Sequence, residues 1–210
     1  MSDTEDLLHG DYFEAKITCR NKIKRIKFIR SRLSTQQRKL FDNTCFRYWL
    51  DIKFQHTDPG YIHFLLQNQI SRPAECKLKE EPEELWFKVT SDYNIRCGRR
   101  EFCLVTSMRF GPNANFKHYI DGDKGKTKPR FASRVLKNHP NNRFKVEHFL
   151  NLIKDKDFFS GNDKRSDEDC VRVVIVLLVQ ECFLGKMPRD RIDINFLHLL
   201  DDLNLMNQFP

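Results

Sequence analysis

The feature that most constrains the fold is a long apolar stretch, Val171–Leu184, near the end of the printed sequence. Its polar or charged members are Arg172, Gln180 and Glu181. The stretch is longer than an ordinary strand, and it stops at Gly185, a residue type that often ends helices. A helix that is apolar on every side has to be covered on every side. The pattern therefore predicts a helix at the centre of the core.

The residues before this stretch admit a second interpretation. Asp167-Glu-Asp-Cys leads into a run of β-branched residues. Acids followed by such a run resemble a segment that binds a ubiquitin-like modifier by adding a strand to a sheet edge. The length of the apolar stretch and the glycine at its end favour the buried helix instead.

The middle of the chain has the pattern of a β-hairpin followed by a helix. Leu85–Val89 and Tyr93–Cys97 are short runs on either side of a polar turn, and Gly98 separates them from a predicted helix at Arg99–Arg109. Three- and four-residue apolar spacing and capping patterns predict further helices at 21–33, 34–40, 61–70, 144–153 and 193–206. We therefore expect an α+β fold, a mainly helical single domain with a small antiparallel β-hairpin.

The domain organisation follows from the same patterns. We expect a disordered tail at residues 1–11 and a single domain of residues 12–210. If this domain has two lobes, their boundary is expected within 113–128, where glycine and lysine are frequent. The expected core takes the apolar faces of the hairpin and of the neighbouring helices. Its predicted members are Trp86, Phe87, Phe102, Val105, Phe110, Val174, Leu177, Leu178 and Leu197.

Composition and cysteine usage indicate an intracellular protein. Hydrophobic residues make up 40% and charged residues 31% of the chain, which is typical of globular proteins. The seven cysteines are odd in number and form no C-x-x-C pair, so we expect reduced thiols. The acidic start lacks the apolar segment of a secretory signal. The longest uninterrupted apolar run, Val173–Val179, is too short to span a bilayer.

Two basic stretches are the strongest functional signal in the residues themselves. The net charge is +8, and nine Lys or Arg residues lie between Arg20 and Lys39 without an acid. A second basic stretch is expected at 117–134. Both stretches resemble nuclear-import signals, so we expect a nuclear protein. Both also fit weak, sequence-tolerant binding of nucleic-acid phosphates, while a solvated helix face is the alternative. The candidate residues are Lys22, Lys24, Arg25, Lys27, Arg30, Arg32, Lys124, Lys126, Lys128 and Arg130.

Catalytic and cofactor motifs are incomplete. Asp121-Gly-Asp resembles the start of a calcium loop, but the positions of the required glycine and closing glutamate hold Lys126 and Ala132. Gly125-Lys126-Thr127 resembles the end of a phosphate-binding loop whose first glycine is replaced by Ile120. The histidines are spread singly, and no local signature surrounds a cysteine. We expect no enzyme activity, no cofactor and no metal.

Several segments resemble a known family. They are Leu85-Trp-Phe-Lys-Val, Ile95-Arg, Arg100-Glu-Phe-Cys-Leu-Val-Thr-Ser-Met-Arg-Phe-Gly, Phe41–Asp51 and Leu199–Pro210. The chain resembles the plant domain of unknown function that precedes ubiquitin-like-protease domains of the SUMO-protease type in proteins derived from Mutator-like transposons. The hairpin followed by a helix is also similar to the plant mobile domain. The resemblance covers residues 12–210, and Arg47 and Ser107 stand where the family commonly has glycine.

The resembled family has no agreed biochemical role, and we expect a role in binding. The protease domain with its catalytic residues is not part of the printed sequence, so no catalytic residue can be transferred. The expected function is a non-catalytic binding or accessory module of a transposon-derived nuclear protein. Its expected partners are another protein, such as a ubiquitin-like protease, or nucleic acid. The alternatives are a sequence-tolerant DNA-binding domain that uses 20–39 and 117–134, and an inactive transposon-derived fragment.

Overall fold

A computed structural model describes residues 18–53, 58–77, 84–108, 128–137, 143–160 and 164–208. The chain divides into two compact units, each of which is described by itself. Unit 1 comprises Met1–Cys19 and Thr57–Phe110, and unit 2 comprises Arg20–His56 and Gly111–Pro210. The expected tail at 1–11 and nearly all of the expected boundary at 113–128 lie outside the described residues. The α+β fold class is confirmed: the fold is mainly helical with one small antiparallel sheet.

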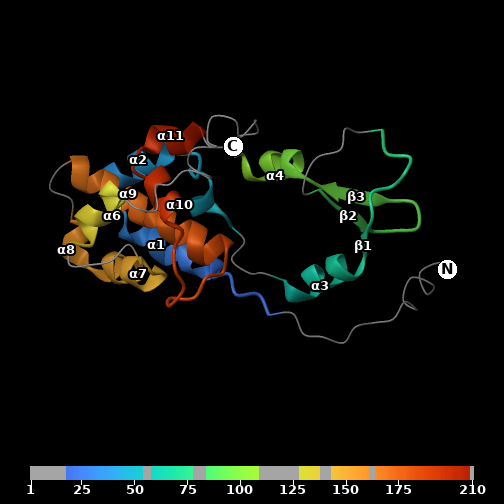
Figure 1. The fold of residues 1–210 in the computed structure, drawn as a ribbon, viewed down its shortest axis with the longest axis horizontal. Coiled ribbons are helices and arrows are strands. Elements are labelled where there is room, and N and C mark those ends of the chain that lie inside the picture. The colour runs from blue at the N-terminus through green and yellow to red at the C-terminus, as the bar shows by residue number, and fades with distance from the viewer. Residues whose placement is uncertain are drawn as a thin grey trace. The chain divides into compact units, whose positions relative to one another are not determined.

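The core of unit 2 is built around the predicted central helix. Helix α9 (Lys164–Leu177) continues into a π-helical turn, η6 (Leu178–Phe183), and all residues from Cys170 to Leu178 are buried. Four helices pack against α9: α2 (Thr35–Asp42), α6 (Arg130–Val135), α7 (Val146–Lys154) and α8 (Lys156–Phe159) (Figure 1). Gly185 ends the helix with φ +61, and a Cβ at this position would lie 2.9 Å from the backbone nitrogen of Asn21. Glycine is therefore required by both its conformation and its surroundings.

The remaining helices of unit 2 are short. Ser34 begins α2 through a capping box, since its hydroxyl accepts from the Gln37 N–H and the Gln37 side chain accepts from the Ser34 N–H. The helix predicted at 193–206 forms two helices, α10 and α11, instead of one. The helices are η2 (Ile23–Arg25), α1 (Ile26–Arg32), α2 (Thr35–Asp42), η3 (Trp49–Asp51), α6 (Arg130–Val135), α7 (Val146–Lys154), α8 (Lys156–Phe159), α10 (Ile194–Leu199) and α11 (Leu203–Gln208).

Unit 1 contains the predicted hairpin. Strands β2 (Leu85–Lys88) and β3 (Asn94–Cys97) pair antiparallel, with Phe87 opposite Ile95. A third strand, β1 (Gln69–Ile70), pairs with the other edge of β2 and has two residues, too few for the sequence pattern to reveal. Two helices complete the described part of the unit: α3 (Pro59–Gln67) before the sheet and α4 (Arg99–Thr106) after it. Trp86 and Phe87 are adjacent and both buried, so both faces of the sheet are covered.

The predicted core is partly confirmed. The buried members are Trp86, Phe87, Val174, Leu177, Leu178 and Leu197. The prediction is wrong for Phe102 and Val105, which are 52% and 85% exposed. Helix α4 turns Arg99, Cys103 and Thr106 toward its unit, at helical spacing, so its largest apolar side chains face outward. Phe110 lies outside the described residues.

The lengths of the described helices also bear on membrane insertion. None of these helices combines the length and the apolar composition that crossing a bilayer requires.

Candidate binding surfaces

Helix α4 is fixed to the sheet at its first turn. The Glu101 carboxylate accepts from the Gly98 N–H at 3.0 Å and from the Arg96 guanidinium at 2.6 and 3.1 Å. The hydrogen bond from Arg96 is the main reason why the pKa of Glu101 is lowered from its ordinary value. These contacts join β3 to α4 and determine which side of the helix faces the unit.

The end of α4 is strained. The Thr106 hydroxyl donates to the Phe102 carbonyl at 2.7 Å and accepts from the Met108 N–H at 3.3 Å. Ser107 follows with φ 59, the one positive φ of a non-glycine residue in the described part of the chain. A residue with a Cβ is strained in this left-handed conformation, so Ser107 carries strain that glycine would not.

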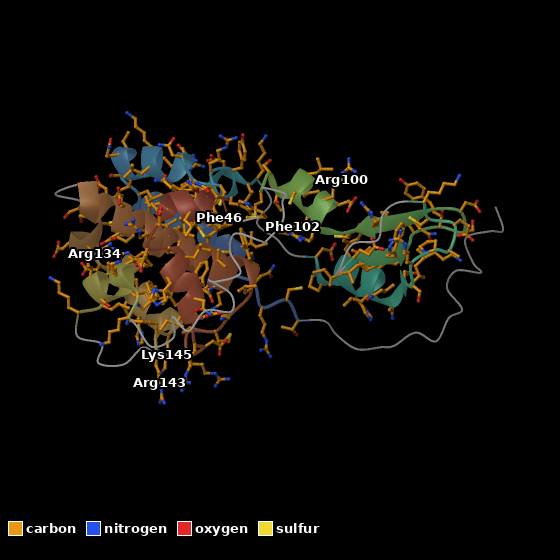
Figure 2. The ribbon with its side chains drawn as sticks, turned by 45° about the horizontal axis from the view of Figure 1, so that its top comes forward. Phe46, Arg100, Phe102, Arg134, Arg143 and Lys145 are labelled. Atoms are coloured by element: carbon orange, nitrogen blue, oxygen red, sulfur yellow. The ribbon has the colours of Figure 1, made fainter. Side chains whose placement is uncertain are left out.

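The outward side of α4 is apolar. Phe102, Leu104 and Val105 are 52%, 75% and 85% exposed. We call these three residues the α4 face. Arg100 is also exposed on this helix, and Figure 2 shows Arg100 and Phe102 on its ribbon. Large apolar side chains grouped at a surface are characteristic of interaction sites.

Exposed apolar side chains gather in unit 1 more generally. Among the described residues, thirteen large hydrophobic side chains are exposed, and nine of them belong to unit 1. The six outside the α4 face are Tyr61, Phe64, Leu66, Leu85, Tyr93 and Ile95. Because most of these exposed apolar side chains lie in unit 1, unit 1 is a stronger candidate for a protein contact than unit 2, and α4 is the candidate element within it.

Four of the basic candidates in 20–39 are engaged inside unit 2. Lys22 Nζ and Arg25 Nε lie 3.5 and 3.1 Å from the carboxylate oxygens of Glu181, which is fully buried. Arg30 pairs with Asp51 at 3.1 Å. Arg32 donates to two backbone carbonyls at the end of α7, those of residues 153 and 155. Lys22, Arg25 and Arg32 therefore stabilise the fold, whereas Arg30 forms an ion pair at the surface. The contacts of all four reduce their availability to an external phosphate.

The other basic candidates have different surroundings. Lys24 and Lys27 are exposed, and neither has an ion-pair partner among the described residues. Lys128 and Arg130 are exposed, and the Arg130 backbone N–H donates to Asp201 at 3.0 Å. Lys124 and Lys126 lie outside the described residues. The structure thus does not gather the ten candidates into one described surface.

A polar pocket of about 580 Å³ lies between α2, α6, α9 and α11 in unit 2. Two arginines of its wall are held by a carboxylate of α9: Asp169 accepts from Arg134 at 2.6 and 2.9 Å and from Arg172 at 2.9 Å. The hydrogen bond to Asp169 is the main cause of the raised pKa of Arg134, which Figure 2 labels. Arg172 also donates to the Leu200 carbonyl at 2.8 Å. These interactions connect α6, α9 and the end of α10, so the polar walls have a structural role.

The two buried thiols are poor nucleophiles. Burial raises the pKa of Cys170 and of Cys182 to about 12, so both are protonated at neutral pH. Within the part of the chain that the structure describes, no group of three or more His, Cys, Asp or Glu side chains has the geometry of a metal site. Neither observation supplies a reaction centre.

Sequence reasoning missed the α4 face because it assigned two of its three residues, Phe102 and Val105, to the core. Residues 102–105 are all apolar, so the sequence pattern carries no signal for which side of this short helix faces outward. Comparisons of the chain with family models, with curated proteins and with solved structures give no match.

Proposed function

We propose that this chain is a non-catalytic protein-binding module that holds its partner on the α4 face. The observation that carries the proposal is the outward position of Phe102, Leu104 and Val105 on a helix whose inner side is formed by Arg99, Cys103 and Thr106. Burying one large apolar side chain contributes about 1.5–3 kcal/mol. Covering three of them supplies several kcal/mol toward an interface.

The expected mode of binding is a helix placed in an apolar groove of the partner. The Arg96–Glu101 contacts and the Gly98 cap hold α4 in one orientation, so little conformational entropy is lost on binding. Arg100 is exposed beside the apolar residues. An acidic group at the rim of the groove would complement it.

The class of partner comes from the family resemblance. A domain that precedes ubiquitin-like proteases in transposon-derived plant nuclear proteins has such a protease as its natural neighbour. We therefore name a ubiquitin-like protease domain of the SUMO-protease type as the partner. The proposed role is to position that protease.

A titration with a purified ubiquitin-like protease domain tests the proposal. The double variant Leu104→Glu/Val105→Glu is expected to weaken binding at least about tenfold, because it places two charges in an apolar interface. The matched control is Thr90→Glu/Ser91→Glu, which adds the same charge at the exposed hairpin turn. It is expected to bind like the wild type.

The outcomes separate the two parts of the proposal. Equal binding by both variants and the wild type would exclude the α4 face as the binding site. No binding by the wild type would exclude this class of partner and favour the alternative of an inactive transposon-derived fragment.

A further inference from the structure

A short two-stranded ribbon in unit 2 carries basic residues that belong to neither of the expected basic stretches. Lys145 and Arg191 form an antiparallel bridge, and the segments 143–147 and 189–193 lie on either side of it. The Ile192 N–H donates to the Phe144 carbonyl at 2.9 Å, and the Val146 N–H donates to the Asp190 carbonyl at 3.1 Å. We call these two segments the basic ribbon.

The basic ribbon has one buried and one exposed face. Phe144, Val146 and Ile192 are buried in unit 2. Side chains alternate between the faces of a strand, so Lys145 and Arg191 point outward, while Arg143 and the turn residue Arg189 are exposed. The outward cations are Arg143, Lys145, Arg189 and Arg191. Figure 2 labels Arg143 and Lys145, whose side chains extend from the surface of unit 2.

The acids on this face do not neutralise the arginines. Glu147 pairs with Lys145 at 3.1 Å, and Asp193 accepts from the Asn195 N–H at 2.8 Å as the cap of α10. Arg143, Arg189 and Arg191 are exposed, and their side chains have no ion-pair partner among the residues that the structure describes.

Further positive charge lies beside the basic ribbon. Lys186 Nζ donates to the Arg191 carbonyl at 2.9 Å. The exposed Arg20 lies against Gly185, the residue before Lys186, so the start of unit 2 lies beside this loop. Segments far apart in the sequence thus contribute to one basic surface.

Like charges directly opposite each other across two strands destabilise the pairing. Lys145 and Arg191 form such a pair, and the hydrogen bonds on either side of it show that it is the closely spaced, non-hydrogen-bonded type. Glu147 pairs with Lys145 and offsets part of this repulsion, so Arg191 is the cation of the pair that lacks an ion-pair partner among the described residues.

We propose that the basic ribbon binds the sugar–phosphate backbone of duplex nucleic acid. Three of its four outward cations are arginines, whose planar guanidinium groups bind phosphate through paired hydrogen bonds. The sequence pI of about 9.1 gives the chain a net positive charge at neutral pH, which adds a long-range attraction to nucleic acid.

The interaction is expected to be independent of base sequence. The outward face of the described ribbon holds cations and two acids and no aromatic side chain, so it offers no platform for stacking bases. The affinity then depends on phosphate neutralisation and falls steeply as the salt concentration rises. The site lies in unit 2, so this inference does not depend on the α4 face in unit 1.

Fluorescence anisotropy of a short labelled duplex, titrated with the full chain at several salt concentrations, tests the proposal. Arg143→Gln/Arg191→Gln is expected to weaken binding about tenfold and to lower the salt slope by roughly two units, one for each phosphate that the variant no longer neutralises. The control, Lys154→Gln/Lys156→Gln, removes the same charge at the far end of α7 and is expected to bind like the wild type.

Three results would overturn the proposal. They are unchanged binding by the ribbon variant, equal weakening in both double variants, and association with anionic lipid vesicles in the absence of duplex binding. Circular dichroism checks the fold of each variant. Arg189→Gln provides a second, single substitution on the same face, for which a smaller decrease in affinity and a slope change of roughly one unit are expected.

Discussion

The Arg25 guanidinium lies 3.1 Å from a carboxylate oxygen of Glu181, whose side chain is completely buried. The two residues are far apart in the sequence, and Lys22 contributes a second cation to the same carboxylate at 3.5 Å. The pair attaches the first helical turn of unit 2 to the π-helical turn η6. The basic stretch predicts that Arg25 is exposed to solvent, but its guanidinium lies against a buried carboxylate.

Arg25→Gln is expected to destabilise unit 2 by about 2–3 kcal/mol, because it leaves the buried Glu181 carboxylate with only Lys22. Urea unfolding followed by far-UV circular dichroism measures the change. The control is Lys24→Gln, an exposed neighbour whose replacement is expected to cost less than about 0.5 kcal/mol. Equal stability of the two variants would contradict a structural role for the ion pair.

Gly185→Ala is expected to destabilise unit 2 by about 2 kcal/mol or more. The left-handed conformation costs roughly 1–2 kcal/mol for an L-residue, and the new Cβ would lie 2.9 Å from the Asn21 backbone nitrogen. Thermal unfolding measures the decrease in stability. A melting temperature equal to that of the wild type would show that the close approach of the two segments is not maintained in solution.

Ser107→Gly is expected to stabilise unit 1 by about 0.5–1 kcal/mol, because glycine adopts φ 59 without the strain that serine carries. Ser107→Ala keeps the Cβ and is the matched control, for which no gain is expected. Denaturant unfolding distinguishes the two. A gain in stability with alanine, or no gain with glycine, would show that strain at residue 107 does not limit the stability of unit 1.

The positions of these residues illustrate what the sequence revealed and what it did not. The central helix, the hairpin and the Ser34–Gln37 capping box depend on local patterns, and all three were predicted. The ion pair of Arg25 depends on a residue far along the chain, so the spacing of basic residues could not show it. The fold class followed from the local patterns alone.

The orientation of α4 could not be predicted from the sequence for a different reason. Residues 102–105 are all apolar, so periodicity could not distinguish the inner from the outer side of this short helix. The contacts of Glu101 with Arg96 and Gly98 decide the orientation. The basic ribbon was likewise invisible in sequence, because it forms only when 143–147 meets 189–193.

Acid is expected to loosen the attachment of α4 to the sheet. Hydrogen bonding from Arg96 lowers the pKa of Glu101 below its ordinary value of 4.5, so this carboxylate stabilises the folded state above that value. The contribution disappears as the pH falls below 4.5 and through the folded-state pKa. Glu101→Gln is expected to make the melting of unit 1 less sensitive to acid in this range. An acid sensitivity equal to that of the wild type would contradict the assignment.

The most direct test of the proposed function is amide hydrogen exchange of the full chain with and without a bound ubiquitin-like protease domain. Slower exchange is predicted over Arg99–Thr106 on binding, with no such change over 90–92 at the hairpin turn. In the Leu104→Glu/Val105→Glu variant the protection of α4 is expected to disappear. Binding that protects other residues while exchange over α4 stays unchanged would contradict the central claim.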